Sequence, residues 1–91
     1  MTAPNQYLVI LRQPDELLIS EGIQAAMIFA SFGESVSLAY SSECSGLISQ
    51  PGTHIAKLIS SFEFYDIEIP MELSDEQTEL KIGEYQCVLS F

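Results

Sequence analysis

The sequence predicts an α/β protein, a three-layer α/β/α sandwich built on a mainly parallel sheet of about four strands. Segments typical of strands alternate with segments typical of helices along the chain, which favours parallel strands joined by helices. The first of these segments, residues 7–11, reads YLVIL, a continuous apolar run typical of a strand buried on both faces. The length of 91 residues fits a single domain, 1–91.

The first helix is the longest one predicted. Residues 1–6 are expected to be a lead-in without regular structure, before the first strand. The helix then starts between Asp15 and Ser20, because both side chains can cap an N-terminus. It continues to Phe32, and Gly33 fits its C-cap.

The middle of the chain predicts two more strands with a helix between them. Residues 35–40 (SVSLAY) form the second strand, and the serine-rich stretch 41–46 is a loop at its carboxyl end. A helical turn begins at residues 47–48. A second helix covers residues 53–64, and the alternating pattern of residues 65–69 (YDIEI) predicts the third strand.

The last predicted elements are a short helix and a strand. Ser74 and Gln77 have the spacing of a capping box, in which the serine oxygen and the glutamine side chain each bond a backbone N–H group. The helix runs from there to about Ile82, and Gly83 stops it. Residues 85–91 form the fourth strand.

Composition excludes some classes of function and favours others. Thirteen acidic residues face three basic ones, for a net charge of −10, so direct nucleic-acid binding is not expected. No targeting segment and no membrane span is recognised, and the two cysteines do not suggest a disulfide framework, so the cytoplasm is the expected location. The apolar content of 47% is high for so small a domain, which predicts an oligomer.

The predicted first helix is apolar around most of its circumference. Its polar residues Ser20, Gln24 and Ser31 fall on one narrow stripe, whereas a surface helix has a wide polar face. One interpretation is a helix packed inside its own domain. The interpretation that we favour is a subunit contact, with Ile23, Met27 and Ile28 as candidate interface residues.

Four segments, taken in order, resemble segments of one known family. They read EGIQAAMIFASF (21–32), LISQPG (47–52), FYDIE (64–68) and EYQCVLSF (84–91). They are similar to the DsrE/DsrF-like family and most of all to its TusC/DsrF branch. There the helix reads Glu-Gly-Leu-Asp-Ala, the turn Leu-Leu-Pro-Gly, the third strand Tyr-Asp-Ile or Tyr-Asp-Val, and the C-terminus Tyr-Asp-Val-Ile-Leu-Arg-Phe. Their shared order and spacing over most of the chain carries the resemblance.

The resemblance implies a DsrE/DsrF-like domain and a role in sulfur relay. In that family, complexes of related small subunits pass persulfide sulfur between proteins, for 2-thiouridine formation in tRNA or for sulfur oxidation. A cysteine just beyond the third strand of the DsrE/TusD subunit carries the sulfur. The matching position here is Pro70 or Met71, so the resemblance implies a non-catalytic subunit of a hetero-oligomer, with Pro70 and Met71 as further interface candidates.

One departure from the family lies between the third and the last predicted strand. Family members of this branch have another strand and helix there, whereas this chain has only residues 71–84. The sheet is therefore expected to be one strand narrower.

Two alternative functions stay open. In one, Cys44 itself carries sulfur, since it lies in a loop after a strand, where sites of open α/β sheets are found. Against this, Glu43 is its neighbour and no basic residue is near in sequence, unlike the surroundings of most reactive thiols. In the other, the chain is a divergent stand-alone homo-oligomer that binds something else. Cys87, inside the last predicted strand, is expected to be a core residue.

The remaining candidates predict no cofactor and no metal. His54 is the only histidine and has no ligand partner at metal-binding spacing, so a surface or capping role is expected. Arg12 ends the first strand and could bind an anion or pair with Glu43 or Asp15; pairing is the favoured interpretation. No glycine-rich phosphate loop is present, and the acidic residues between 72 and 79 are typical of a helix start.

Overall fold

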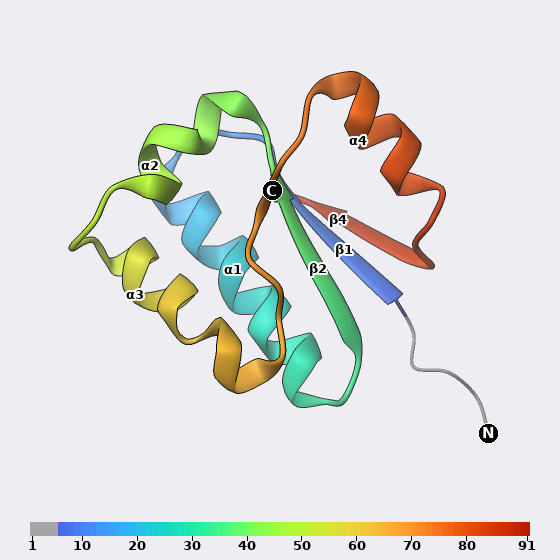
Figure 1. Cartoon of the computed structure of the whole chain (residues 1–91), viewed down its shortest axis with the longest axis horizontal. Helices are drawn as coiled ribbons and strands as arrows, with labels where there is room; N and C mark the ends of the chain where they lie inside the picture. Colours follow the sequence, from blue (N-terminus) through green and yellow to red (C-terminus); the bar gives the residue numbers. More distant parts are fainter. Residues whose placement is uncertain (1–5) are drawn as a thin grey trace.

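The computed structural model describes residues 6–91, and its strands form one parallel sheet (Figure 1). The strand order is β3-β2-β1-β4. All three neighbouring pairs are parallel, so the predicted α/β class with a parallel sheet of four strands is confirmed. The strands are β1 (Gln6–Leu11), β2 (Ser35–Tyr40), β3 (Met71–Glu72) and β4 (Cys87–Ser90).

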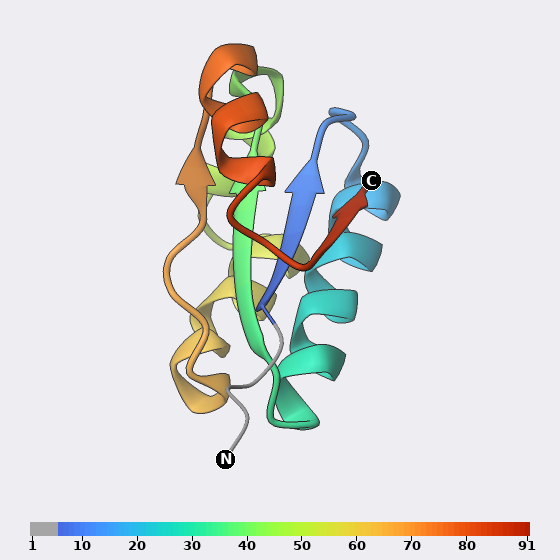
Figure 2. The same ribbon diagram turned by 90° about the vertical axis from the view of Figure 1, so that its right-hand side faces the viewer.

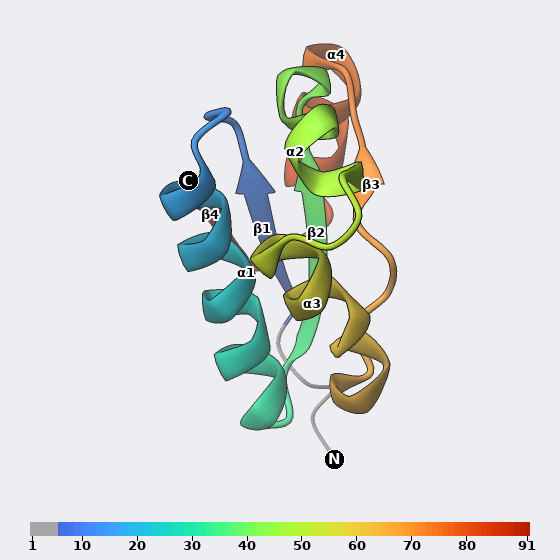
Figure 3. The same ribbon diagram turned by 90° about the vertical axis from the view of Figure 1, so that its left-hand side faces the viewer.

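Helices cover both faces of the sheet. Figure 3 shows α1, α2 and α3 on one face, and Figure 2 shows the last helix, α4, on the other. Right-handed crossovers explain this, because the chain moves from β1 to β3 in one direction and returns past β1 to β4 in the other. The helices are α1 (Glu16–Ser31), α2 (Ser45–Ser49), α3 (His54–Ser60) and α4 (Asp75–Ile82), with 3-10 turns η1 (Ser42–Cys44) and η2 (Phe62–Tyr65).

The central position of β1 in the sheet accounts for its run of apolar residues. Val9 and Leu11 pack into the core below α1 and α3, whereas Leu8 and Ile10 pack on the opposite face with residues that flank α4. Because both faces are covered, every side chain from residue 8 to residue 11 is buried.

Capping side chains set the helix starts that the sequence indicated. Asp15 is the N-cap of α1, and its Oδ1 accepts hydrogen bonds from the backbone N–H groups of Leu17 and Leu18 at 2.9 and 3.1 Å. The predicted capping box of α4 is present, with Ser74 Oγ accepting from Gln77 N and Gln77 Oε1 accepting from Ser74 N.

The predicted third strand, residues 65–69, is wrong. Residues up to Tyr65 form the turn η2, and Asp66 then adopts a left-handed conformation with φ of 57°. A hydrogen bond from Ile67 N to Phe62 O, 3.1 Å long, closes this turn and buries the Ile67 side chain. Strands are extended, so the turn prevents residues 65–69 from joining the sheet.

The third strand instead follows Pro70. Met71 and Glu72 pair with Ala39 and Tyr40 of β2, so the proline precedes β3 and does not end it. A proline cannot donate to a strand partner, and the entry to an edge strand is a place where this costs little.

Other element boundaries differ by a few residues. The predicted loop 41–46 contains η1 and the start of α2, and the predicted helix 53–64 is divided into α3 and η2. The last strand is shorter than the predicted range 85–91. Of the predicted lead-in 1–6, only Gln6 lies inside the described residues, and it belongs to β1.

Candidate functional site

The strand order places a topological switch point between β1 and β4. Open α/β sheets bind ligands outside the carboxyl ends of their strands at such a point. Arg12 follows β1 there, and its Nε donates to Ser90 Oγ at 3.4 Å. Its backbone carbonyl accepts from Ser41 Oγ, also at 3.4 Å, so the connections after β1, β2 and β4 meet at this edge.

The expected ion pair of Arg12 is wrong. Within residues 6–91 the structure contains one ion pair, between Lys81 Nζ and Glu84 Oε2 at 3.4 Å. Asp15 caps α1 through its carboxylate instead, and Arg12 remains exposed with a neutral hydroxyl as its side-chain partner.

Cys44 lies at the same edge, but its side chain has no exposed surface. The last residue of η1 carries it into the core, where Sγ lies 3.5 Å from the carbonyl oxygen of Leu11 and 3.6 Å from Ser41 Oγ. The Leu11 carbonyl is an acceptor, so the thiol donates to it and serves as a hydrogen-bonded core group. A sulfur donor cannot reach the Cys44 thiol in this conformation.

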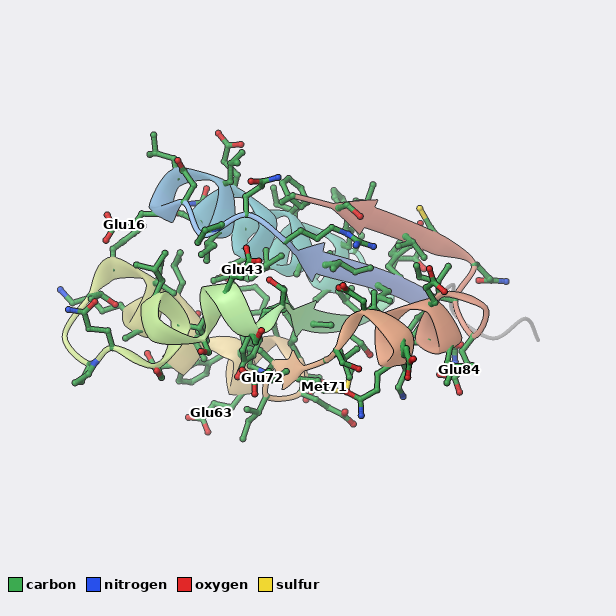
Figure 4. The ribbon with its side chains drawn as sticks, turned by 90° about the horizontal axis from the view of Figure 1, so that it is seen from above. Glu16, Glu43, Glu63, Met71, Glu72 and Glu84 are labelled. Atoms are coloured by element: carbon green, nitrogen blue, oxygen red, sulfur yellow. The ribbon has the colours of Figure 1, made fainter. Side chains whose placement is uncertain are left out.

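Two carboxylates lie at the carboxyl edge of the sheet. Figure 4, seen from above, shows Glu43 on η1 and Glu72 on β3. Tyr40 is the last residue of β2 and pairs with Glu72. Burial, together with the negative charge of Glu72, raises the pKa of Tyr40 above its ordinary value of 10.0. The tyrosine is therefore protonated at neutral pH.

Pro70 and Met71 do not lie beyond the third strand, as the alignment with the family had placed them. Met71 begins β3, and the residues that follow the strand are Leu73 and Ser74. Leu73 N donates to Tyr40 O at 3.0 Å, and Ser74 caps α4. The chain therefore has no thiol at the carboxyl end of β3.

Cys87 is only half-buried, so its prediction as a core residue is wrong in part. It lies in β4, which pairs with β1 on one side and forms the edge of the sheet on the other. An edge strand lacks a neighbour that would enclose its side chains.

His54 is exposed at the first position of α3. The cap of that helix is Thr53, whose Oγ1 accepts from Ala56 N at 3.1 Å. Together with Glu16, Ser20 and other residues at the starts of α1 and α3, His54 lines a hollow of about 160 Å³. Within residues 6–91, no three Asp, Glu, His or Cys side chains are grouped so that they could hold a metal ion.

The predicted interface helix has a buried side and an exposed side. Ile23 is completely buried against the sheet, so it belongs to the core of its own domain and its assignment to an interface is corrected. Ile28 is exposed, whereas Met27 is partly buried against the same core as Ile23. Both line a surface hollow of about 270 Å³ with Gln24, Ser31 and Tyr65. The sequence did not indicate Tyr65 as a site residue, because residues 65–69 were predicted to form a strand.

Other exposed apolar side chains are close in sequence to the residues that line this hollow. Phe32 follows α1 and is 78% exposed, and Phe64 precedes Tyr65 in η2 and is 81% exposed. Ile69, in the connection to β3, is 85% exposed. Exposed apolar groups of this size are common at protein contacts.

Comparison of the chain with models of known families, with curated proteins and with solved structures found no match. Among the helices of residues 6–91, none has the length and apolar character needed to cross a membrane.

Proposed function

We propose that this chain is a non-catalytic subunit of a small hetero-oligomeric sulfur-relay complex, of the tRNA 2-thiouridine or the sulfur-oxidation type. The observation that carries the proposal is the combination of the four segments that resemble the TusC/DsrF branch with a carboxyl edge that offers no accessible thiol. Its partners would be related small subunits, one of which supplies the sulfur-carrying cysteine.

The chemistry of persulfide transfer supports a passive role. An acceptor thiolate attacks the outer sulfur of a donor persulfide, a new S–S bond forms, the old one breaks, and the donor leaves as a thiolate. The acceptor must be reachable and partly ionised. Cys44 is enclosed and donates to the Leu11 carbonyl, and the residues directly after β3, Leu73 and Ser74, carry no thiol.

The surface of α1 supports a role in assembly. Ile28 is 56% exposed and, with Met27 and Tyr65, lines an open hollow between α1 and η2. Burial of such a surface in a subunit contact would remove apolar area from water, which favours association by about 25 cal/mol for each Å².

Native mass spectrometry of the tagged protein, purified gently from its own cells, tests this proposal. We expect mixed complexes with two other small chains. A pure homo-oligomer at native expression levels would contradict the proposal and would favour the stand-alone alternative.

Sulfur-relay assays of variants separate the passive subunit from a carrier that uses Cys44. Cys44→Ser and Cys44→Ala both remove the thiol, and a passive subunit should retain relay activity in both once folding has been verified. Loss of activity in both folded variants would instead identify Cys44 as the carrier.

A further inference from the structure

The hollow on α1 has mainly apolar walls and is open to solvent. Gln24, Met27, Ile28 and Ser31 line it from α1, and Tyr65 lines it from η2. The two polar side chains that α1 contributes are already engaged: Gln24 Nε2 donates to Ser20 Oγ at 3.2 Å, and Ser31 Oγ donates to Ile28 O at 2.6 Å. Apolar side chains of an occupant would therefore find a surface that makes few polar demands.

The charged residues that are closest in sequence to the lining residues are acidic. Glu63 and Asp66 lie close to Tyr65 in sequence, and Glu21 lies one helical turn before Gln24 on the exposed side of α1. The last turn of α1 has no basic residue, so the negative end of the helix dipole is not neutralised there. None of the three basic residues of the chain lines the hollow.

Glu34 adds to the negative charge at the end of α1. It lies three residues beyond Ser31, and its Oε2 is shielded from solvent. Among residues 6–91, no group donates a hydrogen bond to this oxygen. Glu34 is therefore a further acidic residue at this end of α1, where the helix dipole is also negative.

Two other hollows include a lysine or a histidine among their lining residues. The one beside α4 includes Lys81, whose ammonium group pairs with Glu84, and the one between α1 and α3 includes His54. The hollow formed with Tyr65 has no cation among its lining residues. A fourth hollow, on α4, also lacks a cation, but its lining of Glu76, Glu79 and Leu80 has one apolar side chain, whereas the hollow between α1 and η2 has Met27, Ile28 and Tyr65.

We infer that the hollow between α1 and η2 binds a segment of a partner protein that presents an apolar side chain next to arginine or lysine. The apolar group fills the space beside Met27, Ile28 and Tyr65, and the cation faces Glu63, Asp66 and the end of α1. A second copy of this chain is a poor occupant, because its net charge of −10 would meet the same acidic surroundings.

The inference deepens the proposed function and rests on it in taking the occupant to be a protein segment. The residues of the hollow suit that role. Met27 has a flexible side chain that adapts to different shapes, and Tyr65 is an aromatic residue of the kind enriched at contact centres. The aromatic face of Tyr65 can also attract a cation directly.

An NMR titration of the isotope-labelled full chain tests the inference with a synthetic amphipathic helix of leucine and lysine as the probe. We expect the largest backbone shifts at the lining residues Gln24, Met27, Ile28, Ser31 and Tyr65. A leucine–glutamate peptide of the same pattern should cause none, and a lysine–serine peptide should bind more weakly by about 10-fold, because it lacks the apolar anchor. Added salt should weaken binding of the leucine–lysine peptide.

Two matched substitutions of exposed apolar residues localise the binding. Ile28→Ser should weaken binding of the leucine–lysine peptide by about 10-fold, whereas Leu80→Ser on α4 should change it by less than about 2-fold. Equal effects of the two substitutions, or shifts centred on the acidic residues of α4, would overturn the inference.

The peptide titration and the native mass spectrum test the two proposals separately. Mixed complexes in the native mass spectrum, together with peptide binding elsewhere on the chain, would keep the relay subunit and reject this hollow as its contact. A homo-oligomer whose hollow binds the leucine–lysine peptide would do the reverse.

Discussion

The ring of Phe91 lies directly against Gly22 of α1. A Cβ atom added at Gly22 would lie 3.1 Å from Phe91 Cδ1 and would collide with Leu11 Cδ2. Leu11 is fully buried at the end of β1, and the backbone of Phe91 bonds both Ile10 and Arg12. The glycine therefore allows the helix to approach the carboxyl ends of β1 and β4.

Gly22→Ala should lower the free energy of unfolding. Alanine gains up to about 1 kcal/mol in helix propensity, but overpacking costs about 1–3 kcal/mol, so we expect a net loss of about 1 kcal/mol in chemical denaturation. Gly46→Ala in α2 is the matched control, because nothing lies within 4 Å of its added Cβ. A Gly22→Ala protein at least as stable as the parent would contradict the packing described for Phe91.

The two cysteines should differ in their reaction with a thiol reagent. Cys87 is half-buried on an edge strand, whereas Cys44 is enclosed in the core. In Cys87→Ser protein, we expect the remaining thiol to react on the order of 100-fold more slowly than in denaturant, because an opening of the structure must come first. Equally fast reaction in the native protein would show an accessible Cys44 and would revive the carrier hypothesis.

Ser74→Ala should destabilise the protein by about 1 kcal/mol in chemical denaturation. The substitution removes the oxygen that accepts from Gln77 N and leaves an N–H group at the start of α4 without its partner. Glu79→Ala, at an exposed position of the same helix, serves as control and should change stability by less than about 0.5 kcal/mol. If both variants lose the same stability, the capping box contributes nothing of its own.

Tyr40 should make the protein less stable at alkaline pH. Burial and Glu72 raise its folded pKa above 10.0, so the unfolded chain loses this proton first as the pH rises. The free energy of unfolding should therefore decrease with pH from about the ordinary tyrosine pKa, 10.0, up to the folded pKa, and its contribution should level off above it. Denaturation curves collected across this pH range measure the effect.

Two variants isolate the contribution of Tyr40 from those of the other tyrosines. Tyr40→Phe should remove this part of the alkaline decrease, and Glu72→Gln should reduce it by removing the smaller, electrostatic cause. An unchanged decrease in Tyr40→Phe protein would assign it to other groups.

Several elements could be predicted from local sequence because local interactions determine them. Asp15 and Ser74 cap helices by bonding backbone groups within three residues of themselves. Such caps can therefore be recognised from the sequence alone. Gly33 ends α1 with a φ of 85°, a conformation that other residues adopt only at a cost. The apolar run of β1 likewise predicted a strand covered on both faces, which is what a parallel sheet requires.

The tertiary structure alone decided where the third strand lies and which side chains are accessible. Residues 65–69 alternate as a strand does, but pairing depends on where β2 is within reach, and only Met71 and Glu72 reach it. Whether a residue of an apolar helix such as Ile23 faces the sheet or solvent depends on how the helix is rotated against β1 and β2, and Cys44 is enclosed because η1 turns it inward towards the Leu11 carbonyl. Local sequence specifies backbone preference, whereas burial arises from contacts between segments far apart in the chain.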